Sequence, residues 1–244
     1  MGLFVVSTGM FTPEIRRQRA KLQNSKDETV DKTNRLSAMR QDYREGILRK
    51  AEAPADPLEL FALWMDDAIA ADLPEPNAMT LATIGSDGRP AARIVLLKGV
   101  GPDGFRFFTN YDSRKGEELA AHPFAALVFL WLGLQRQVRV EGRVHRISGE
   151  ESDAYFVSRP RGSRLGAWAS PQSQSVSNRE ELEARLEAAE ARFGEGDVPR
   201  PPNWGGYRLA ADRIEFWQGR TSRLHDRLVY LFNEGKWERE RLAP

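Results

Sequence analysis

Basic side chains gather with hydroxyl and amide side chains in four short segments of this sequence, and that combination suits anion binding. The first segment, residues 93–98, reads RIVLLK. In a strand its side chains would alternate between two faces, which places Arg93 and Lys98 on opposite faces among apolar neighbours. Taken alone, the hexamer favours an ordinary strand with charged ends.

The second segment, residues 109–116, reads TNYDSRKG. Ser113 suits the N-cap of a short helix, and Arg114 and Lys115 follow in its first turn. Cations in that position oppose the helix dipole, whereas the free N–H groups there attract anions. A phosphate site and a plain surface helix fit the segment about equally, and a bound dianion would account for the cations.

The third segment, residues 159–173, combines cations, hydroxyls and amides, and we expect it to be a long loop. Loops of this length inside a domain are often functional. A disordered linker is the alternative, but Leu165 and Trp168 favour a segment that packs against the domain.

The fourth segment, residues 214–227, includes RLHDR at 223–227. Strand alternation would place Arg223, His225 and Arg227 on one face. Three potential cations side by side repel one another unless an anion lies among them. A lone structural histidine is the alternative, and the triplet favours a face that binds a ligand.

The elements that position these segments are mostly short strands joined by hairpins. We expect strands at 78–85, 90–98, 105–109, 124–132, 137–147, 207–217, 224–232 and 236–241. The continuous apolar run at 124–132 predicts a strand buried on both faces. Helices are expected from an Asp56 cap, with Leu58, Phe61, Met65 and Ile69 on one face; at 152–158; and from a capping box of Ser177 and Glu180. The pattern predicts a mainly β, α+β fold: a closed or nearly closed antiparallel barrel with peripheral helices.

Composition excludes several classes of function. Lys and Arg number 36 against 35 Asp and Glu, so no global nucleic-acid footprint is expected. The absence of cysteine excludes disulfides, thiolate zinc sites and a cysteine nucleophile. The three histidines lack ligand spacing, so no metal site is expected. No stretch has the length of a membrane span, and we expect a cytoplasmic protein. Residues 1–38 are polar and predict a disordered arm, a transit segment or a mis-assigned start.

At these residues the sequence resembles the pyridoxine/pyridoxamine 5′-phosphate oxidase family, from about Arg40 to Pro244. The resemblance rests on RIVLLK at 93–98, FTNYDSRK at 108–115, RQV at 136–138, SRPRGSRLGAW at 158–168, QS at 172–173, WGG at 204–206, IEFWQG at 214–219, RLHDR at 223–227 and the terminal RLAP. It implies an FMN-binding split β-barrel over residues 56–244 with a C-terminal dimerisation region, preceded by a substrate lid at 39–55. Many relatives have Tyr where this chain has Phe108.

The resemblance also implies the roles of individual residues. FMN would be bound by Arg93, Ile94, Val95, Leu96, Leu97, Lys98, Phe108, Thr109, Arg114, Lys115, Gln137, Gln172, Ser173, Trp217 and Arg227. Substrate would be bound by Arg40, Gln41, Asp42, Tyr43, Lys98, Tyr155, Arg159, Ser163, Arg223, Leu224 and His225. Arg223 and His225 would be the catalytic pair. Lys98, Tyr155, Arg159 and Ser163 suit a cradle for the substrate phosphate.

Members of the family are homodimers with FMN at the subunit interface. The resemblance therefore implies oxidation of pyridoxamine and pyridoxine 5′-phosphate to pyridoxal 5′-phosphate by O2, with neither nucleic acid nor membrane as a partner. Two alternatives stay open from the sequence. One is a split-barrel flavoprotein oxidase or reductase with another substrate. The other is a protein that binds FMN or pyridoxal phosphate without turnover.

Overall fold

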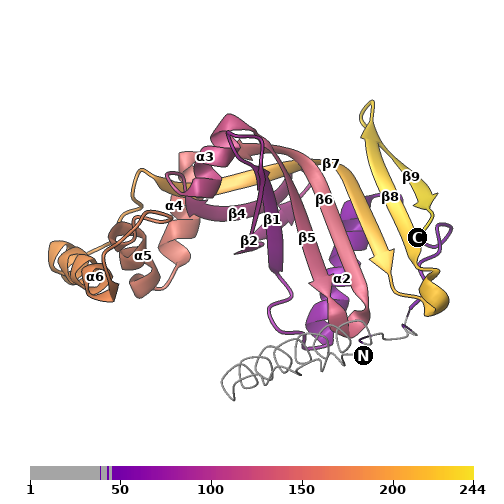
Figure 1. Ribbon diagram of the computed structural model, residues 1–244, viewed down its shortest axis with the longest axis horizontal. Helices are drawn as coiled ribbons and strands as arrows, with labels where there is room; N and C mark the ends of the chain where they lie inside the picture. Colours follow the sequence, from indigo (N-terminus) through magenta and orange to yellow (C-terminus); the bar gives the residue numbers. More distant parts are fainter. Residues whose placement is uncertain (1–38, 40–42, 44–45) are drawn as a thin grey trace, which may run out of the picture. The chain divides into compact units, whose positions relative to one another are not determined.

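The computed structural model of this protein describes residues 39, 43 and 46–244 (Figure 1). The arm predicted at 1–38 lies outside the described residues, and so do Arg40, Gln41 and Asp42 of the predicted lid. Within the described part, no helix is both long enough and apolar enough to cross a membrane.

One nine-stranded antiparallel sheet forms the body of the protein (Figure 1). Its strands are β1 (Ala78–Ile84), β2 (Pro90–Leu96), β3 (Gly99–Gly101), β4 (Gly104–Asn110), β5 (Phe124–Trp131), β6 (Arg136–Arg146), β7 (Trp204–Gln218), β8 (Asp226–Asn233) and β9 (Lys236–Leu242). They follow the order β2-β1-β5-β6-β7-β4-β3, and β8 pairs with both β7 and β9. The predicted class, a mainly β fold with helices at its edges, is confirmed.

The sheet curls until β4 returns beside β2. The backbone N–H of Lys98 donates to the carbonyl oxygen of Arg106 at 2.8 Å, which joins the chain after β2 to β4. In the described sheet β2 pairs with β1 and β4 pairs with β3 and β7, so no regular ladder joins β2 to β4. The barrel is therefore split along this line.

The barrel interior is apolar, as the alternation of β6 predicted. Leu127, Phe129, Val138 and Ile214 are fully buried there. Burying this many large side chains supplies most of the stabilisation of such a fold. Strand β5 corrects one expectation: its exposure alternates, and Leu130 is 57% exposed, so the strand is buried on one face only. An apolar run alone does not reveal which of its two faces meets the core.

Helix α2 (Pro57–Ala70) covers one end of the barrel, and its cap is confirmed because Leu58 N–H donates to Asp56 Oδ1 at 2.8 Å. Its buried face differs from the predicted one. Trp64 and Ala68 are buried with Phe61, whereas Ile69 is 59% exposed. The bulky indole packs edge-on against the core ring of Phe216 at 5.2 Å and thereby shifts the buried stripe by one residue.

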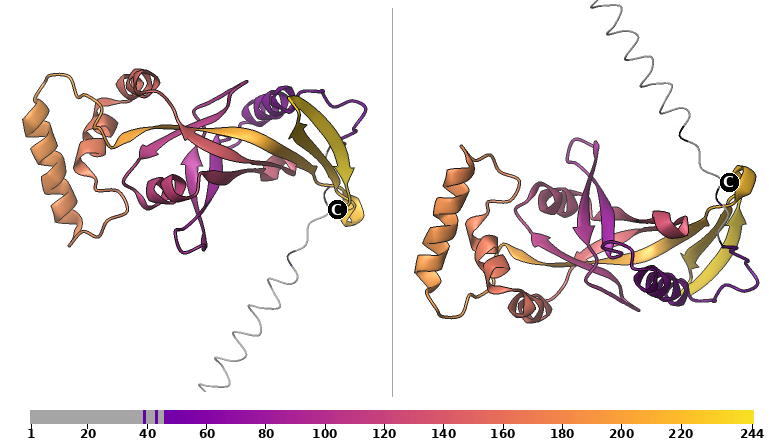
Figure 2. Two further views of the ribbon diagram at one scale, coloured as in Figure 1. Left: turned by 90° about the horizontal axis from the view of Figure 1, so that it is seen from above. Right: turned by 90° about the horizontal axis from the view of Figure 1, so that it is seen from below.

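The remaining helices are α3 (Arg114–Ala121), α4 (Gly149–Ser158), α5 (Arg161–Ala169) and α6 (Arg179–Phe193), with short 3-10 turns η1 (Leu132–Leu134) and η2 (Thr221–Arg223). Helix α5 corrects the loop predicted at 159–173: Leu165 and Ala169 bury one side of a helix. Helix α6 is capped by Asn178, and Ser177 instead bonds to Glu181. Figures 1 and 2 show α4, α5 and α6 at one end of β7, and β8, β9 and η2 at the other.

Candidate functional site

A cavity of about 530 Å³ opens where β2 and β4 face each other across the split. It is lined by Arg93, Ile94, Val95, Leu96, Lys98, Phe108, Thr109, Lys115, Tyr155, Arg159, Pro160, Ser163, Gln172 and Trp204. All but Pro160 and Trp204 belong to the predicted cofactor or substrate residues. The tertiary structure thus brings the first three predicted segments to one place.

Lys115 forms the inner wall of this cavity. Lys115 is 9% exposed. Its ammonium group donates to Thr109 Oγ1 at 3.2 Å, Ser113 Oγ at 3.3 Å and Gln172 Oε1 at 3.0 Å. Burial lowers the pKa of Lys115, and the nearby charge of Arg93 lowers that pKa further. These acceptors are neutral and Lys115 makes no salt bridge among the described residues, so an anion in the cavity would meet a positive charge that only the more distant Glu118 offsets in part.

The start of α3 is built as predicted around Ser113. Gly116 N–H donates to Ser113 Oγ at 3.4 Å, which caps the helix. A Cβ atom on Gly116 would lie 2.0 Å from the carbonyl oxygen of Tyr111, so only glycine permits this close approach. The first turn of α3 therefore reaches the cavity with Lys115 pointing inward.

Arg93 is held differently, by a carboxylate that sequence reasoning missed. Its Nη2 donates to Glu118 Oε2 at 2.8 Å, and its Nη1 donates to Thr83 Oγ1. Burial acts to raise the pKa of Glu118, but hydrogen bonds from Thr83, Arg93 and Arg114 outweigh it and lower that pKa. Arg114 donates to the other oxygen of Glu118 at 2.8 Å and is 67% exposed, so its side chain lies outside the cavity.

Arg159 is a cavity cation that makes no salt bridge among the described residues. Its guanidinium lies over the rings of Trp204 at 4.6 Å and Phe156 at 5.4 Å. Its buried Nη1 has no hydrogen-bond partner in the described part of the chain, and burial lowers the pKa of the side chain. A buried donor of this kind calls for an acceptor. The cavity lining holds four cations and no carboxylate, which fits phosphate groups.

A second group of predicted residues forms a row across three strands. Gln137 of β6 lies opposite Trp217 of β7, and Trp217 lies opposite Arg227 of β8. Arg227 Nε donates to the buried Glu215 at 2.8 Å. The side chains of this row lie on the same face of the sheet as the pair of Arg227 and Glu215. The row does not line the cavity.

The strand predicted at 224–232 is confirmed as β8, but it begins only at Asp226, so the predicted alternation of Arg223 and His225 within it is wrong. Residues Thr221–Arg223 form η2, and φ is +56° at Ser222 and +60° at Arg223, so the chain bends before β8 begins. Left-handed backbone at two successive residues breaks any alternation. Leu224 is 71% exposed at the bend.

His225 is fixed by a backbone contact within the same bend. Arg220 N–H donates to His225 Nδ1 at 3.1 Å, so the neutral ring carries its proton on Nε2. Burial, and then the charge of Arg223, lower the pKa of His225. The ring packs 4.6 Å from that of Trp217 and 5.7 Å from that of Tyr43. Of the predicted lid, Tyr43 therefore lies beside the catalytic candidates.

The cavity residues and the row of Gln137, Trp217 and Arg227 lie at opposite ends of β7. Trp204 opens β7 and lines the cavity, whereas Trp217 stands thirteen positions later, near the end of the same strand. A strand rises about 3.3 Å per residue, so roughly 40 Å of chain separates them. One chain alone does not bring both groups to the same ligand. Two further cofactor candidates miss the cavity: Leu97 lies in the barrel core, and Ser173 does not line it.

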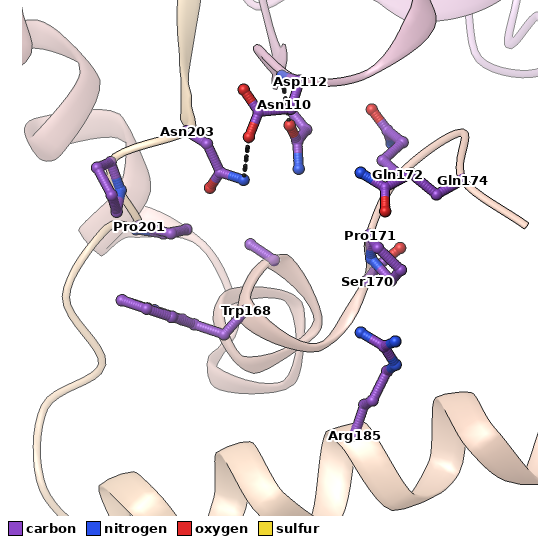
Figure 3. A pocket seen from close by; sticks show the side chains of 12 residues that line it. Asn110, Asp112, Trp168, Ser170, Pro171, Gln172, Gln174, Arg185, Pro201 and Asn203 are labelled. Atoms are coloured by element: carbon purple, nitrogen blue, oxygen red, sulfur yellow. Dashed lines mark hydrogen bonds between the residues drawn. The ribbon is translucent and has the colours of Figure 1, made fainter. Parts of the chain in front are cut away.

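A smaller cavity of about 430 Å³ adjoins the first, and Gln172 lines both. Figure 3 shows Arg185 and Trp168 on opposite sides of it, and Asn203 hydrogen-bonded to Asp112 at 2.9 Å.

In the described part of the chain, no group of three or more metal-ligating side chains occurs.

Comparison with known proteins gives consistent matches over most of the chain. Residues 65–193 match the family described as pyridoxamine 5′-phosphate oxidase, and residues 204–244 match the pyridoxine 5′-phosphate oxidase C-terminal dimerisation region. A pyridoxine/pyridoxamine 5′-phosphate oxidase of Thermosynechococcus vestitus is 62% identical over 86% of this chain and 99% of its own. One of Burkholderia multivorans is 58% identical over 86% and 99%.

Solved structures show the same fold. PhzG from Burkholderia lata, in complex with tetrahydrophenazine-1-carboxylic acid, superposes with a TM-score of 0.77 at 31% identity, over 82% of this chain and 99% of its own. A pyridoxamine 5′-phosphate oxidase-related, FMN-binding protein of Nostoc punctiforme superposes with a TM-score of 0.62 at 21% identity, over 79% and 98%.

Proposed function

Since this chain belongs to the pyridoxine/pyridoxamine 5′-phosphate oxidase family, we propose that it oxidises pyridoxamine and pyridoxine 5′-phosphate to pyridoxal 5′-phosphate with FMN as cofactor. Molecular oxygen is the final acceptor and is reduced to hydrogen peroxide, and the amine substrate also releases ammonia. The observation that carries this proposal is the cavity at the barrel split, where four cations and no carboxylate line one space. Relatives of 55–62% identity carry the same activity in their names.

The residues present fit FMN. Lys115, with its neutral partners Thr109 and Gln172, would hold the cofactor phosphate at the start of α3. Arg93, fixed by Glu118, would lie along the flavin with the backbone of β2. When bound, FMN supplies the acceptor for the hydride that leaves the C4′ carbon of the substrate.

The substrate phosphate takes the outer part of the same cavity. Lys98, Tyr155, Arg159 and Ser163 together offer two cations and two hydroxyls, which suits a phosphate monoester. Lys98 is exposed and Arg159 is partly buried, so the cradle reaches from solvent to the inner wall. Binding there would hold the vitamin ring with C4′ toward the flavin.

The second half of the site comes from a partner subunit in a homodimer. The row of Gln137, Trp217 and Arg227 lies roughly 40 Å along β7 from the cavity, so one chain does not complete the site. The match of residues 204–244 to a dimerisation region supports this arrangement. We infer that this row and the neighbouring Arg223 and His225 face the cavity of the other subunit.

Arg223 and His225 orient the C4′ substituent. His225 is neutral and presents its Nε2–H as a donor, because its Nδ1 accepts from Arg220. Arg223 adds a positive charge beside it. Hydride transfer from a bound amine or alcohol depends above all on positioning, so these side chains act by alignment and charge balance.

An absorbance spectrum tests the proposal. The purified protein should be yellow, and anaerobic addition of pyridoxamine 5′-phosphate should bleach the flavin band. Air should then restore the band and yield peroxide. A colourless protein that refuses added FMN would overturn the cofactor assignment. A yellow protein whose band survives the substrate would overturn the substrate assignment.

A second candidate function follows from the likeness to PhzG, whose structure holds a phenazine precursor. That ligand carries a carboxylate and no phosphate, whereas this cavity offers a cradle of two cations and two hydroxyls. Oxygen consumption with a panel of both substrate classes would separate them. A protein that binds FMN without turnover would produce no peroxide with either.

A further inference from the structure

Two arginines line the cavity, and they are held in different ways. A carboxylate fixes Arg93, through a 2.8 Å salt bridge to Glu118. Arg159 has no salt bridge among the described residues, and its guanidinium instead lies over Trp204 at 4.6 Å. The positive charge of Arg159 is therefore oriented without being neutralised.

Trp204 is itself rigidly placed. It opens β7, is 7% exposed and lines the cavity. Its ring is nearly parallel to those of Phe108, 5.6 Å away at 12°, and Tyr155, 6.2 Å away at 6°. Its carbonyl oxygen accepts from Arg200 at 2.7 Å, which fixes the backbone. The indole thus offers a fixed flat face to Arg159.

We propose that Trp204 is a positioning residue for the substrate phosphate: its indole face directs the guanidinium of Arg159 into the cavity and leaves its charge for the phosphate. This inference rests on the proposed function, because it takes the phosphate of the vitamin as the ligand. It goes beyond that function by naming what sets the preference for phosphorylated over unphosphorylated vitamin.

An aromatic support has a physical advantage over a carboxylate here. A carboxylate would neutralise Arg159 and repel the incoming dianion, whereas a ring face attracts the cation through its quadrupole. Residues 39, 43 and 46–244 provide no hydrogen-bond partner for the buried Nη1 of Arg159, so this donor is available to a phosphate oxygen. Burial lowers the pKa of Arg159, which fits a guanidinium that makes no salt bridge among the described residues.

The test compares ligands with and without a phosphate on the FMN-loaded enzyme. The variants are Trp204→Phe and Trp204→Leu, and the measurements are the dissociation constants of pyridoxal 5′-phosphate, pyridoxal and inorganic phosphate. We expect Trp204→Leu to weaken both phosphate ligands about tenfold, or about 1.4 kcal/mol, with pyridoxal little changed. Trp204→Phe keeps a ring face, so its dissociation constants for the two phosphate ligands should lie between those of the wild type and those of Trp204→Leu. The FMN dissociation constant should not change.

Trp168→Phe is the matched control. Trp168 belongs to the same small hydrophobic cluster and has its own cation–π contact, with Arg192 at 4.5 Å, but it does not line the cavity. A double-mutant cycle with Arg159→Lys adds a second measurement, because Trp204→Leu should cost much less when the guanidinium is absent.

Two outcomes would overturn the inference. One is a Trp204→Leu variant that binds inorganic phosphate and pyridoxal 5′-phosphate as tightly as wild type. The other is an equal loss of pyridoxal and pyridoxal 5′-phosphate, which indicates a purely structural role. Failure of the proposed function looks different: the wild-type enzyme would not oxidise the phosphorylated vitamin, whatever residue 204 is.

Discussion

The Nζ atom of Lys115 lies 3.0 Å from the Oε1 atom of Gln172, which is the nearest of three neutral acceptors around a buried ammonium group. This contact joins the first turn of α3 to the chain after α5, 57 residues away. It aligns the ammonium group without pairing it with a carboxylate.

Lys115→Met should weaken FMN binding about tenfold or more, because it removes a charge-assisted contact to phosphate. The pKa of Lys115 is lowered by burial and by Arg93, and a bound phosphate would raise it. FMN binding therefore takes up a proton, and affinity should fall as pH rises through the lowered pKa, below 10.5. Fluorescence titration of apoprotein against pH checks this. If Lys115→Met loses FMN affinity as steeply at high pH as the wild type does, Lys115 is not the cause of the pH dependence.

Arg223→Ala should abolish most turnover while FMN stays bound, because we propose that Arg223 contacts the substrate and not the cofactor. We expect kcat to fall at least a hundredfold, since a lost orienting charge acts on the reacting position. Steady-state oxygen consumption and the FMN content of the purified variant provide the two measurements. A variant that oxidises substrate at the wild-type rate would show that the catalytic assignment is wrong.

His225 should be active in its neutral form. Burial and Arg223 lower its pKa below 6.5, so the ring becomes charged only in acid. Protonation of Nδ1 also destroys its acceptance from Arg220 N–H. The value of kcat/KM should therefore decline as pH falls below 6.5, and His225→Gln should lack that acidic limb. If kcat/KM of His225→Gln still declines in acid, another group causes that decline.

Glu215→Gln should destabilise the protein strongly. The carboxylate is 2% exposed and lies 2.8 Å from Arg227 and 3.6 Å from both Arg139 and Arg213. Removing the charge leaves Arg227 without a carboxylate partner among the described residues and leaves Arg139 and Arg213 with Glu141 alone, which costs about 3 kcal/mol of the free energy of unfolding.

Denaturant unfolding at one fixed protein concentration measures the effect of Glu215→Gln. Glu183→Gln is its control, because Glu183 makes an exposed i,i+4 pair with Arg179. That pair is worth about 0.5 kcal/mol or less. Equal stability of the two variants would mean that the cluster around Glu215 contributes nothing.

Local patterns in the sequence determined the elements of this fold well. The alternation at 137–147 predicted the inward side chains of β6, and Val138 and Val140 are buried. The caps at Asp56 and Ser113 are also confirmed. Such features depend on neighbours in the chain, so sequence carries them directly. Family motifs identified most of the cavity residues in the same way.

Tertiary structure alone decided which residues meet and what holds them. Glu118 and Arg93 are 25 residues apart, and their salt bridge forms only because α3 packs against β1, the strand that pairs with β2. Trp204 reached the cavity through the register of β7 against β4. The bend at Ser222 and Arg223 also overrode strand alternation. Long-range pairing and positive φ values depend on the packed whole, and no local periodicity encodes them.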